Sequence, residues 1–107
     1  MKPGVLFVDD EIINLFVFER RFAEDFVVFT AESGENAIDL IEDDPTKVDA
    51  VVTDLRMPGL EGMELIEEIK KVRDIPCYLL TGYDITAEIE NSIASGLVKG
   101  YFRKPFN

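Results

Sequence analysis

Short apolar segments alternate with longer amphipathic segments along the whole chain, and this alternation constrains the fold more than any other feature. A continuous apolar run is typical of a strand covered on both faces, whereas apolar residues three and four positions apart indicate a helix. Strands are expected at 5–8, 26–30, 48–55, 75–81 and 100–102, with helices at 11–24, 33–44, 61–72 and 85–94. Strands that alternate with helices in one domain predict an α/β fold, in which a doubly wound parallel sheet of five strands carries helices on both faces.

The length and charge of the chain narrow the possible classes of protein. With 107 residues, it is long enough for one compact domain and too short for two. It has 11 Lys and Arg against 22 Asp and Glu, a net charge of −11, which disfavours direct binding of nucleic acid by this domain. Nothing near Met1 resembles a signal peptide, and no apolar run approaches the ~18 residues of a membrane helix. We therefore expect a cytoplasmic protein that does not contact a membrane.

Two residue types are informative because they are scarce. The sequence has no histidine, which excludes histidine-based zinc sites, Ser-His triads and a phosphohistidine donor within the chain. It has one cysteine, Cys77, inside the apolar run IPCYLL, so an internal disulfide is excluded and a buried, unreactive thiol is expected.

Polar residues gather where the expected strands end. Two acids, Asp9 and Asp10, follow the first strand, and the other strand ends carry Asp54 (third), Thr81 (fourth) and Lys104 (after the fifth). In an open parallel sheet, ligands bind at the carboxyl ends of the strands. Each of these residues alone has an ordinary explanation as a capping, turn or surface residue. All five at one edge indicate a functional site.

The acidic run DDE at 9–11 needs a compensating charge, because adjacent acids at the end of a buried strand repel each other. A hard divalent cation such as Mg²⁺ explains the run best, since Mg²⁺ takes oxygen ligands and bridges carboxylates to phosphoryl oxygens. A flavodoxin-like phosphate site is disfavoured, because the acids would repel the phosphate.

A phosphatase of the haloacid dehalogenase type is another alternative. Such enzymes use an Asp nucleophile with a second Asp two residues later. Glu11 lies two residues after Asp9, but the residues two after Asp10 and Asp54 are not acidic. This alternative keeps weak support from Glu11, and no P-loop or Rossmann glycine motif occurs.

Four motifs in this order resemble the receiver domains of two-component response regulators: VDDE (8–11), TDLRMPG (53–59), LTG (80–82) and KPF (104–106). The segments SGENAIDLI (33–41) and LEGMELIEEIK (60–70) are similar to the second and third helices of that family. The resemblance covers the whole chain. It implies the strand order 2-1-3-4-5 and a single receiver domain over 1–107.

The resemblance also implies a role for each residue at the sheet edge. Asp54 is the phosphoacceptor, and Asp10 and Asp54 ligate Mg²⁺ directly. Asp9 ligates it chiefly through water, and the backbone carbonyl of Arg56 supplies a further ligand. Lys104 pairs with the phosphoryl oxygens.

The resemblance also implies roles in switching and in the aim of the lysine. Thr81 moves to hydrogen-bond a phosphoryl oxygen, and Tyr101 matches the aromatic residue that turns inward with it. The Lys104–Pro105 peptide is expected to be cis.

The residues two after Asp54 and two after Thr81 modulate the lifetime of the phosphoryl group in this family. Here they are Arg56 and Tyr83, both large, so we expect a comparatively long-lived phosphoryl group.

The chain departs from the family at its end, because it stops at Asn107 where family members continue into a fifth helix. Without that helix, the last three strands would lie bare on the side of the first helix. We therefore expect a C-terminally truncated domain, N-terminal in a longer protein, with a C-terminal effector domain or a homodimer partner.

The resulting expectation is a phosphorylation-activated switch in a phosphorelay, supplied by a sensor histidine kinase or a histidine phosphotransfer protein. It would not be an enzyme beyond catalysing its own aspartyl phosphorylation and dephosphorylation. The alternative is a receiver-like interaction module that does not cycle phosphate.

Overall fold

Every expected element is present in the computed structural model, which describes residues 2–82 and 86–104. The strands are β1 (Gly4–Val8), β2 (Val27–Ala31), β3 (Ala50–Asp54), β4 (Cys77–Thr81) and β5 (Gly100–Arg103). The helices are α1 (Ile12–Phe22), α2 (Gly34–Asp43), α3 (Gly62–Val72) and α4 (Ala87–Ala94). Their bounds differ from the expected ones by a few residues, as is usual where helices and strands fray.

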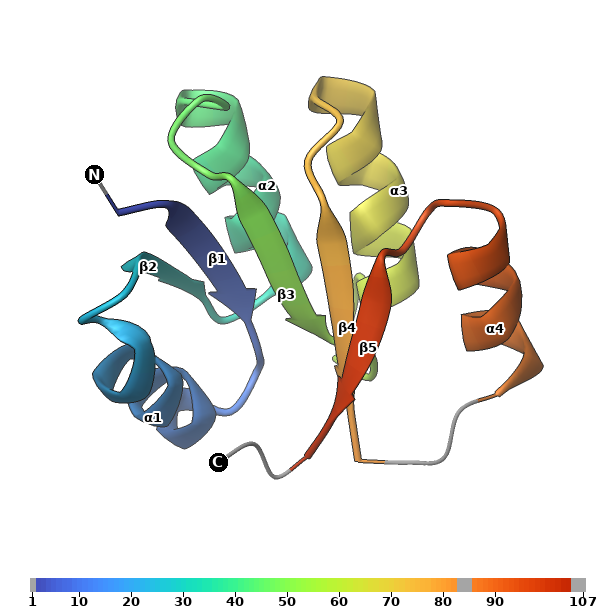
Figure 1. Cartoon of the computed structure of the whole chain (residues 1–107), viewed down its shortest axis with the longest axis horizontal. Helices are drawn as coiled ribbons and strands as arrows, with labels where there is room; N and C mark the ends of the chain where they lie inside the picture. Colours follow the sequence, from blue (N-terminus) through green and yellow to red (C-terminus); the bar gives the residue numbers. More distant parts are fainter. Residues whose placement is uncertain (1, 83–85, 105–107) are drawn as a thin grey trace.

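The strands form one parallel sheet in the order β2-β1-β3-β4-β5, which confirms the doubly wound α/β fold. Helix α1 lies on one face of the sheet, and α2, α3 and α4 lie on the other (Figure 1). The right-handed crossover rule explains this division. The connection from β1 to β2 runs toward one edge of the sheet while the later connections run toward the other, so α1 falls on the opposite face.

The central strand β1 shows why a continuous apolar run is needed. All of its residues are buried, and successive side chains point to opposite faces. Leu6 and Val8 join the core formed with α2, α3 and α4, whereas Val5 and Phe7 join the core under α1. Phe7 stacks on Phe18 of α1, with ring centroids 4.2 Å apart and planes inclined by 12°.

Helix α1 covers only part of its face of the sheet. Beside it lies an apolar groove of about 630 Å³, whose walls include Val52, Tyr78 and Leu80 from the strands and Phe18 from α1. Phe102 of β5 also lines the groove and is 51% exposed. The last three strands are therefore partly covered on the side of α1 and not bare, since Leu80 is buried and Val52 half-buried while Phe102 stays exposed.

The helix ends follow the expected capping chemistry. The Ser33 side chain caps α2 by accepting a hydrogen bond from the Asn36 N–H at 3.1 Å. Gly96 follows α4 with φ +87° and Gly59 lies in the turn before α3 with φ +75°, conformations that favour glycine.

In the part of the chain that the structure describes, no helix is long and apolar enough to cross a membrane.

Candidate acidic metal site

The carboxyl ends of the strands bring the five predicted residues to one edge of the sheet. Strand β1 leads into Asp9 and Asp10, β3 ends at Asp54, β4 ends at Thr81, and β5 leads into Lys104. Parallel pairing across β1, β3, β4 and β5 aligns these ends. The backbone N–H of Lys104 extends the alignment beyond β5 by donating to the Thr81 carbonyl at 2.8 Å.

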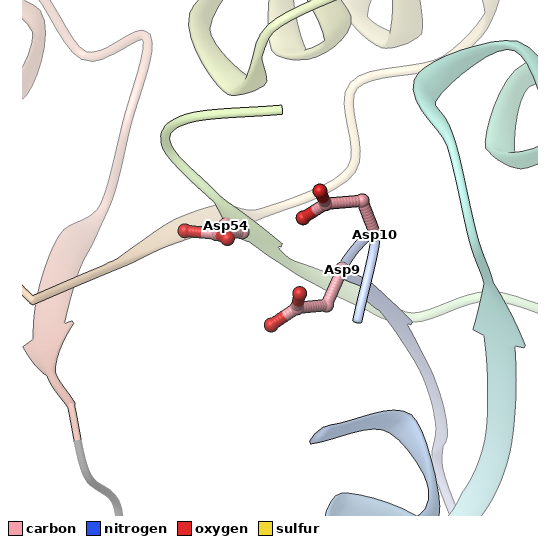
Figure 2. A group of neighbouring side chains, drawn as sticks. All are labelled: Asp9, Asp10 and Asp54. Atoms are coloured by element: carbon pink, nitrogen blue, oxygen red, sulfur yellow. The ribbon is translucent and has the colours of Figure 1, made fainter. Parts of the chain in front are cut away.

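The three acids form a compact cluster. Asp9, Asp10 and Asp54 each offer one carboxylate oxygen, and these oxygens all lie within 4.8 Å of one another. Figure 2 shows the three side chains gathered at the ends of β1 and β3. Asp9 is fully buried and Asp54 is 6% exposed, whereas Asp10 is exposed to solvent. Such a set of oxygen donors, open on one side, suits a hard divalent cation that keeps part of its water shell.

Lys104 provides positive charge beside the acids. Its ammonium donates a hydrogen bond to the Asp54 carboxylate at 3.0 Å and lies 3.6 Å from the Asp9 carboxylate. Burial raises the pKa of Asp54, although the hydrogen bond and charge of Lys104 act to lower it. Burial acts to lower the pKa of Lys104, but the hydrogen bond to Asp54 and the negative charges of Asp54 and Asp9 outweigh burial and raise that pKa. The lysine is therefore charged at neutral pH and offsets only part of the clustered negative charge.

Asp9 is held by donors on both of its oxygens. Its Oδ1 accepts the backbone N–H of Glu11 at 2.9 Å, and its Oδ2 accepts the side-chain amide of Asn14 at 3.0 Å. These bonds satisfy a carboxylate that has no access to solvent. Sequence reasoning did not identify Asn14, because a polar residue in the first turn of a helix normally reads as a surface residue.

Gly62, the first residue of α3, lets that helix begin against the end of β3. A Cβ atom on Gly62 would lie 2.4 Å from the Asp54 carbonyl oxygen and 3.1 Å from the Leu55 Cα. The Gly62 N–H donates to the Leu55 carbonyl at 3.1 Å, which ties the start of α3 to the end of β3. The sequence analysis also missed this residue, and a glycine at the first position of a helix that follows an acidic strand end was the available signal.

The remaining predicted residues lie around this cluster. Thr81 is buried at the end of β4, and Tyr101 is half-buried in β5. The Arg56 side chain is exposed, with its guanidinium 3.7 Å from the Glu61 carboxylate. Tyr83 and Pro105 lie outside the described residues, so the lifetime role of Tyr83 and the cis peptide before Pro105 stay predictions.

Comparison with known proteins agrees with this arrangement. Residues 5–107 match the family described as the response regulator receiver domain. The chain is 36% identical over 103 residues to the heme response regulator HssR of Staphylococcus aureus (strain MRSA252). That match covers 94% of this chain and 44% of HssR, so the chain spans less than half the length of this relative.

Two solved structures are also similar to this chain in fold. An adenylate cyclase from Rhodopirellula baltica is similar with a TM-score of 0.92 and 29% identity, covering 100% of this chain and 79% of that one. The response regulator TrrA from Thermotoga maritima, solved in complex with Mg²⁺-BeF, has a TM-score of 0.81 and 32% identity, covering 100% of this chain and 90% of that one. The family match over nearly the whole chain, together with the acidic cluster at the sheet edge, shows that the chain belongs to the response regulator receiver domains of two-component signalling.

Proposed function

We propose that this domain is a phosphorylation-controlled switch in which Asp54 accepts a phosphoryl group from a phosphohistidine. The observation that carries the proposal is the position of Asp54 between two acids and an ammonium at the open edge of the sheet. The donor is a separate protein, either a sensor histidine kinase or a histidine phosphotransfer protein, because this chain has no histidine.

The proposed cofactor is Mg²⁺. Asp10 and Asp54 would ligate it directly, Asp9 chiefly through water, and the backbone carbonyl of Arg56 would complete the protein ligands. When bound, Mg²⁺ would supply positive charge that offsets the negative charge of the transferred phosphoryl group. The similarity to TrrA, which was solved with Mg²⁺-BeF, supports this choice of metal.

The chain's own residues account for the rest of the reaction. A carboxylate oxygen of Asp54 attacks the phosphorus, a P–O bond forms, and the P–N bond of the phosphohistidine breaks. The released imidazole nitrogen then takes a proton from water. Lys104, already 3.0 Å from the Asp54 carboxylate, turns its ammonium to an oxygen of the new phosphoryl group.

Thr81 and Tyr101 would transmit the phosphorylation of Asp54 to the protein surface as a conformational change. The Thr81 hydroxyl moves to hydrogen-bond a second phosphoryl oxygen, and the half-buried Tyr101 ring turns inward behind it. Arg56 and Tyr83 would slow the attack of water on the phosphoryl group. The recipient of the signal would be an effector domain or a second copy of the domain.

A receiver-like module that binds a partner without cycling phosphate is the other candidate. The presence of the acids, Thr81 and Lys104 at one edge favours the phosphorylated switch. Incubation with Mg²⁺ and phosphoramidate, a small donor with a P–N bond, tests the difference by intact-protein mass spectrometry. The switch gains one phosphoryl group, and Asp54→Asn or added EDTA abolishes the gain. A wild-type protein that gains no phosphoryl group would favour the interaction module.

A further inference from the structure

Asn14 lies in the first turn of α1 and contacts the acidic cluster. Its side-chain amide donates to Asp9 Oδ2 at 3.0 Å, so it reaches back from α1 to the acidic cluster. The neighbouring side chains of this turn, Ile12 and Ile13, have no hydrogen-bond donor and point toward solvent, being 64% and 75% exposed. Asn is also a weaker helix former than residues such as Leu or Glu. The contact with Asp9 gives a physical reason for Asn at this position.

The contact restricts what Asp9 can do. A carboxylate rotates about its Cβ–Cγ bond unless both of its oxygens are held. In this protein the Glu11 N–H holds Oδ1 at 2.9 Å, and Asn14 holds Oδ2. Asp9 is fully buried, so water does not replace a lost donor without a rearrangement. Asn14 therefore determines the direction of the Asp9 carboxylate.

Asn14 also shares an oxygen with the lysine of the site. Asp9 Oδ2 accepts from Asn14 at 3.0 Å and lies 3.6 Å from the Lys104 ammonium, which is 3.0 Å from Asp54. While Asn14 donates to this oxygen, the oxygen attracts Lys104 less strongly. Without the amide, the ammonium would be drawn from Asp54 toward Asp9.

We propose that Asn14 is a positioning residue for the cation. It fixes the Asp9 carboxylate toward the space between the three acids and keeps the Lys104 ammonium on Asp54. The inference rests on the proposed function in one respect, namely that Mg²⁺ binds among Asp9, Asp10 and Asp54. Hydrogen-bond partners of metal ligands typically contribute 10–100-fold to metal affinity.

The test is a calorimetric titration with Mg²⁺ alone, without any phosphodonor. Asn14→Leu keeps a side chain of similar size and removes the donor. Asn91→Leu makes the same substitution at an exposed position of α4, away from the site, and serves as the matched control. We expect Asn14→Leu to bind Mg²⁺ about 10-fold or more weakly, while Asn91→Leu binds it like the wild type.

A second measurement uses the wild-type protein and does not depend on how a variant folds. In a ¹⁵N spectrum, the two side-chain amide protons of Asn14 should be well separated, exchange slowly with solvent and shift on Mg²⁺ addition. Those of Asn91 should behave as a free amide throughout. The Asn91 signals also report any general effect of Mg²⁺ on surface amides.

The outcomes separate this inference from the proposed function. Wild-type Mg²⁺ binding together with unchanged affinity in Asn14→Leu would overturn the role of Asn14 and leave the proposed function intact. A lower unfolding temperature in Asn14→Leu with unchanged affinity would likewise mean a merely structural role. A wild-type protein that binds no Mg²⁺ would overturn both. An Asn14 amide that exchanges like that of Asn91 would overturn the inference even if Asn14→Leu does not fold.

Discussion

The Lys104 ammonium donates a hydrogen bond to the Asp54 carboxylate at 3.0 Å across 50 positions of sequence. This pair joins the ends of two strands that are not neighbours, since β4 lies between β3 and β5. It places one cation against a cluster of three carboxylates. The site without metal is therefore short of positive charge, which is the condition that a bound divalent cation would relieve.

Removing the lysine charge should destabilise the metal-free protein. In Lys104→Met, Asp54 and Asp9 lose their cationic partner, and we expect the free energy of unfolding to fall by about 1–3 kcal/mol at pH 7. Urea unfolding in EDTA measures this, with the exposed Lys99→Met as the control. Mg²⁺ should recover most of the loss. Equal stability of the two variants would mean that Lys104 does not compensate the acids.

Cation binding should stabilise the fold through the acids. At a Mg²⁺ concentration 100 times the Kd, the free energy of unfolding should rise by about 2.7 kcal/mol. Asp10→Asn and Asp54→Asn should lose this gain, because each removes a charged ligand. Asp39→Asn, at an exposed position of α2, should keep it. Urea midpoints with and without Mg²⁺ provide the measurement, and a gain retained in Asp54→Asn would contradict the assigned site.

The start of α3 should tolerate no side chain at Gly62. In Gly62→Ala, the new Cβ would lie 2.4 Å from the Asp54 carbonyl oxygen, so α3 and the end of β3 must separate. We expect a loss of about 1–3 kcal/mol in stability, together with weaker Mg²⁺ binding. Gly100→Ala is the control, because its Cβ would meet its nearest neighbour, the Tyr78 ring, at an ordinary 3.8 Å. If both variants unfold at the same urea concentration, a Cβ atom at position 62 does not force α3 away from the end of β3.

The buried thiol should make stability depend on alkaline pH. Burial raises the pKa of Cys77 from 9.0 to about 11, so the unfolded chain ionises before the folded one. The stabilising contribution is therefore fully present below pH 9 and is lost as pH rises toward 11. A difference of about two units between the pKa of the thiol in the unfolded and the folded protein corresponds to about 3 kcal/mol of stability.

Urea unfolding of wild type and Cys77→Ala across this pH range measures the effect. The variant has no thiol to titrate, so the difference in stability between the two proteins should shrink as the pH rises. A difference that stays constant with pH would show that the thiol is accessible to solvent or titrates near its ordinary pKa.

Much of the fold and the site follows from the sequence because the apolar runs determine where strands end. A run such as VLFV can be covered on both faces only as a central strand, so Asp9 must lie at its carboxyl end. Asp54 and Lys104 follow by the same reasoning at the ends of β3 and β5. Local patterns thus predict the members of the site that lie on or directly after strands.

Contacts between elements are not visible in such patterns. The role of Asn14 depends on the angle at which α1 leaves β1, and that of Gly62 depends on how closely α3 approaches β3. The apolar residues of α1 give a similar lesson, because Phe18 is buried while Phe16, two residues earlier, is 57% exposed. Tertiary packing, which no local spacing encodes, decides these positions.

The most direct test of the central claim is to locate the phosphoryl group. The protein is incubated with Mg²⁺ and acetyl phosphate, and borohydride then reduces any aspartyl phosphate to homoserine, which tandem mass spectrometry assigns to one position. We predict homoserine at position 54 in the wild type, and none in Asp54→Asn or in a sample containing EDTA. Modification at Asp9 or Asp10, or no modification in the wild type, would contradict the assignment of Asp54 as the phosphoacceptor.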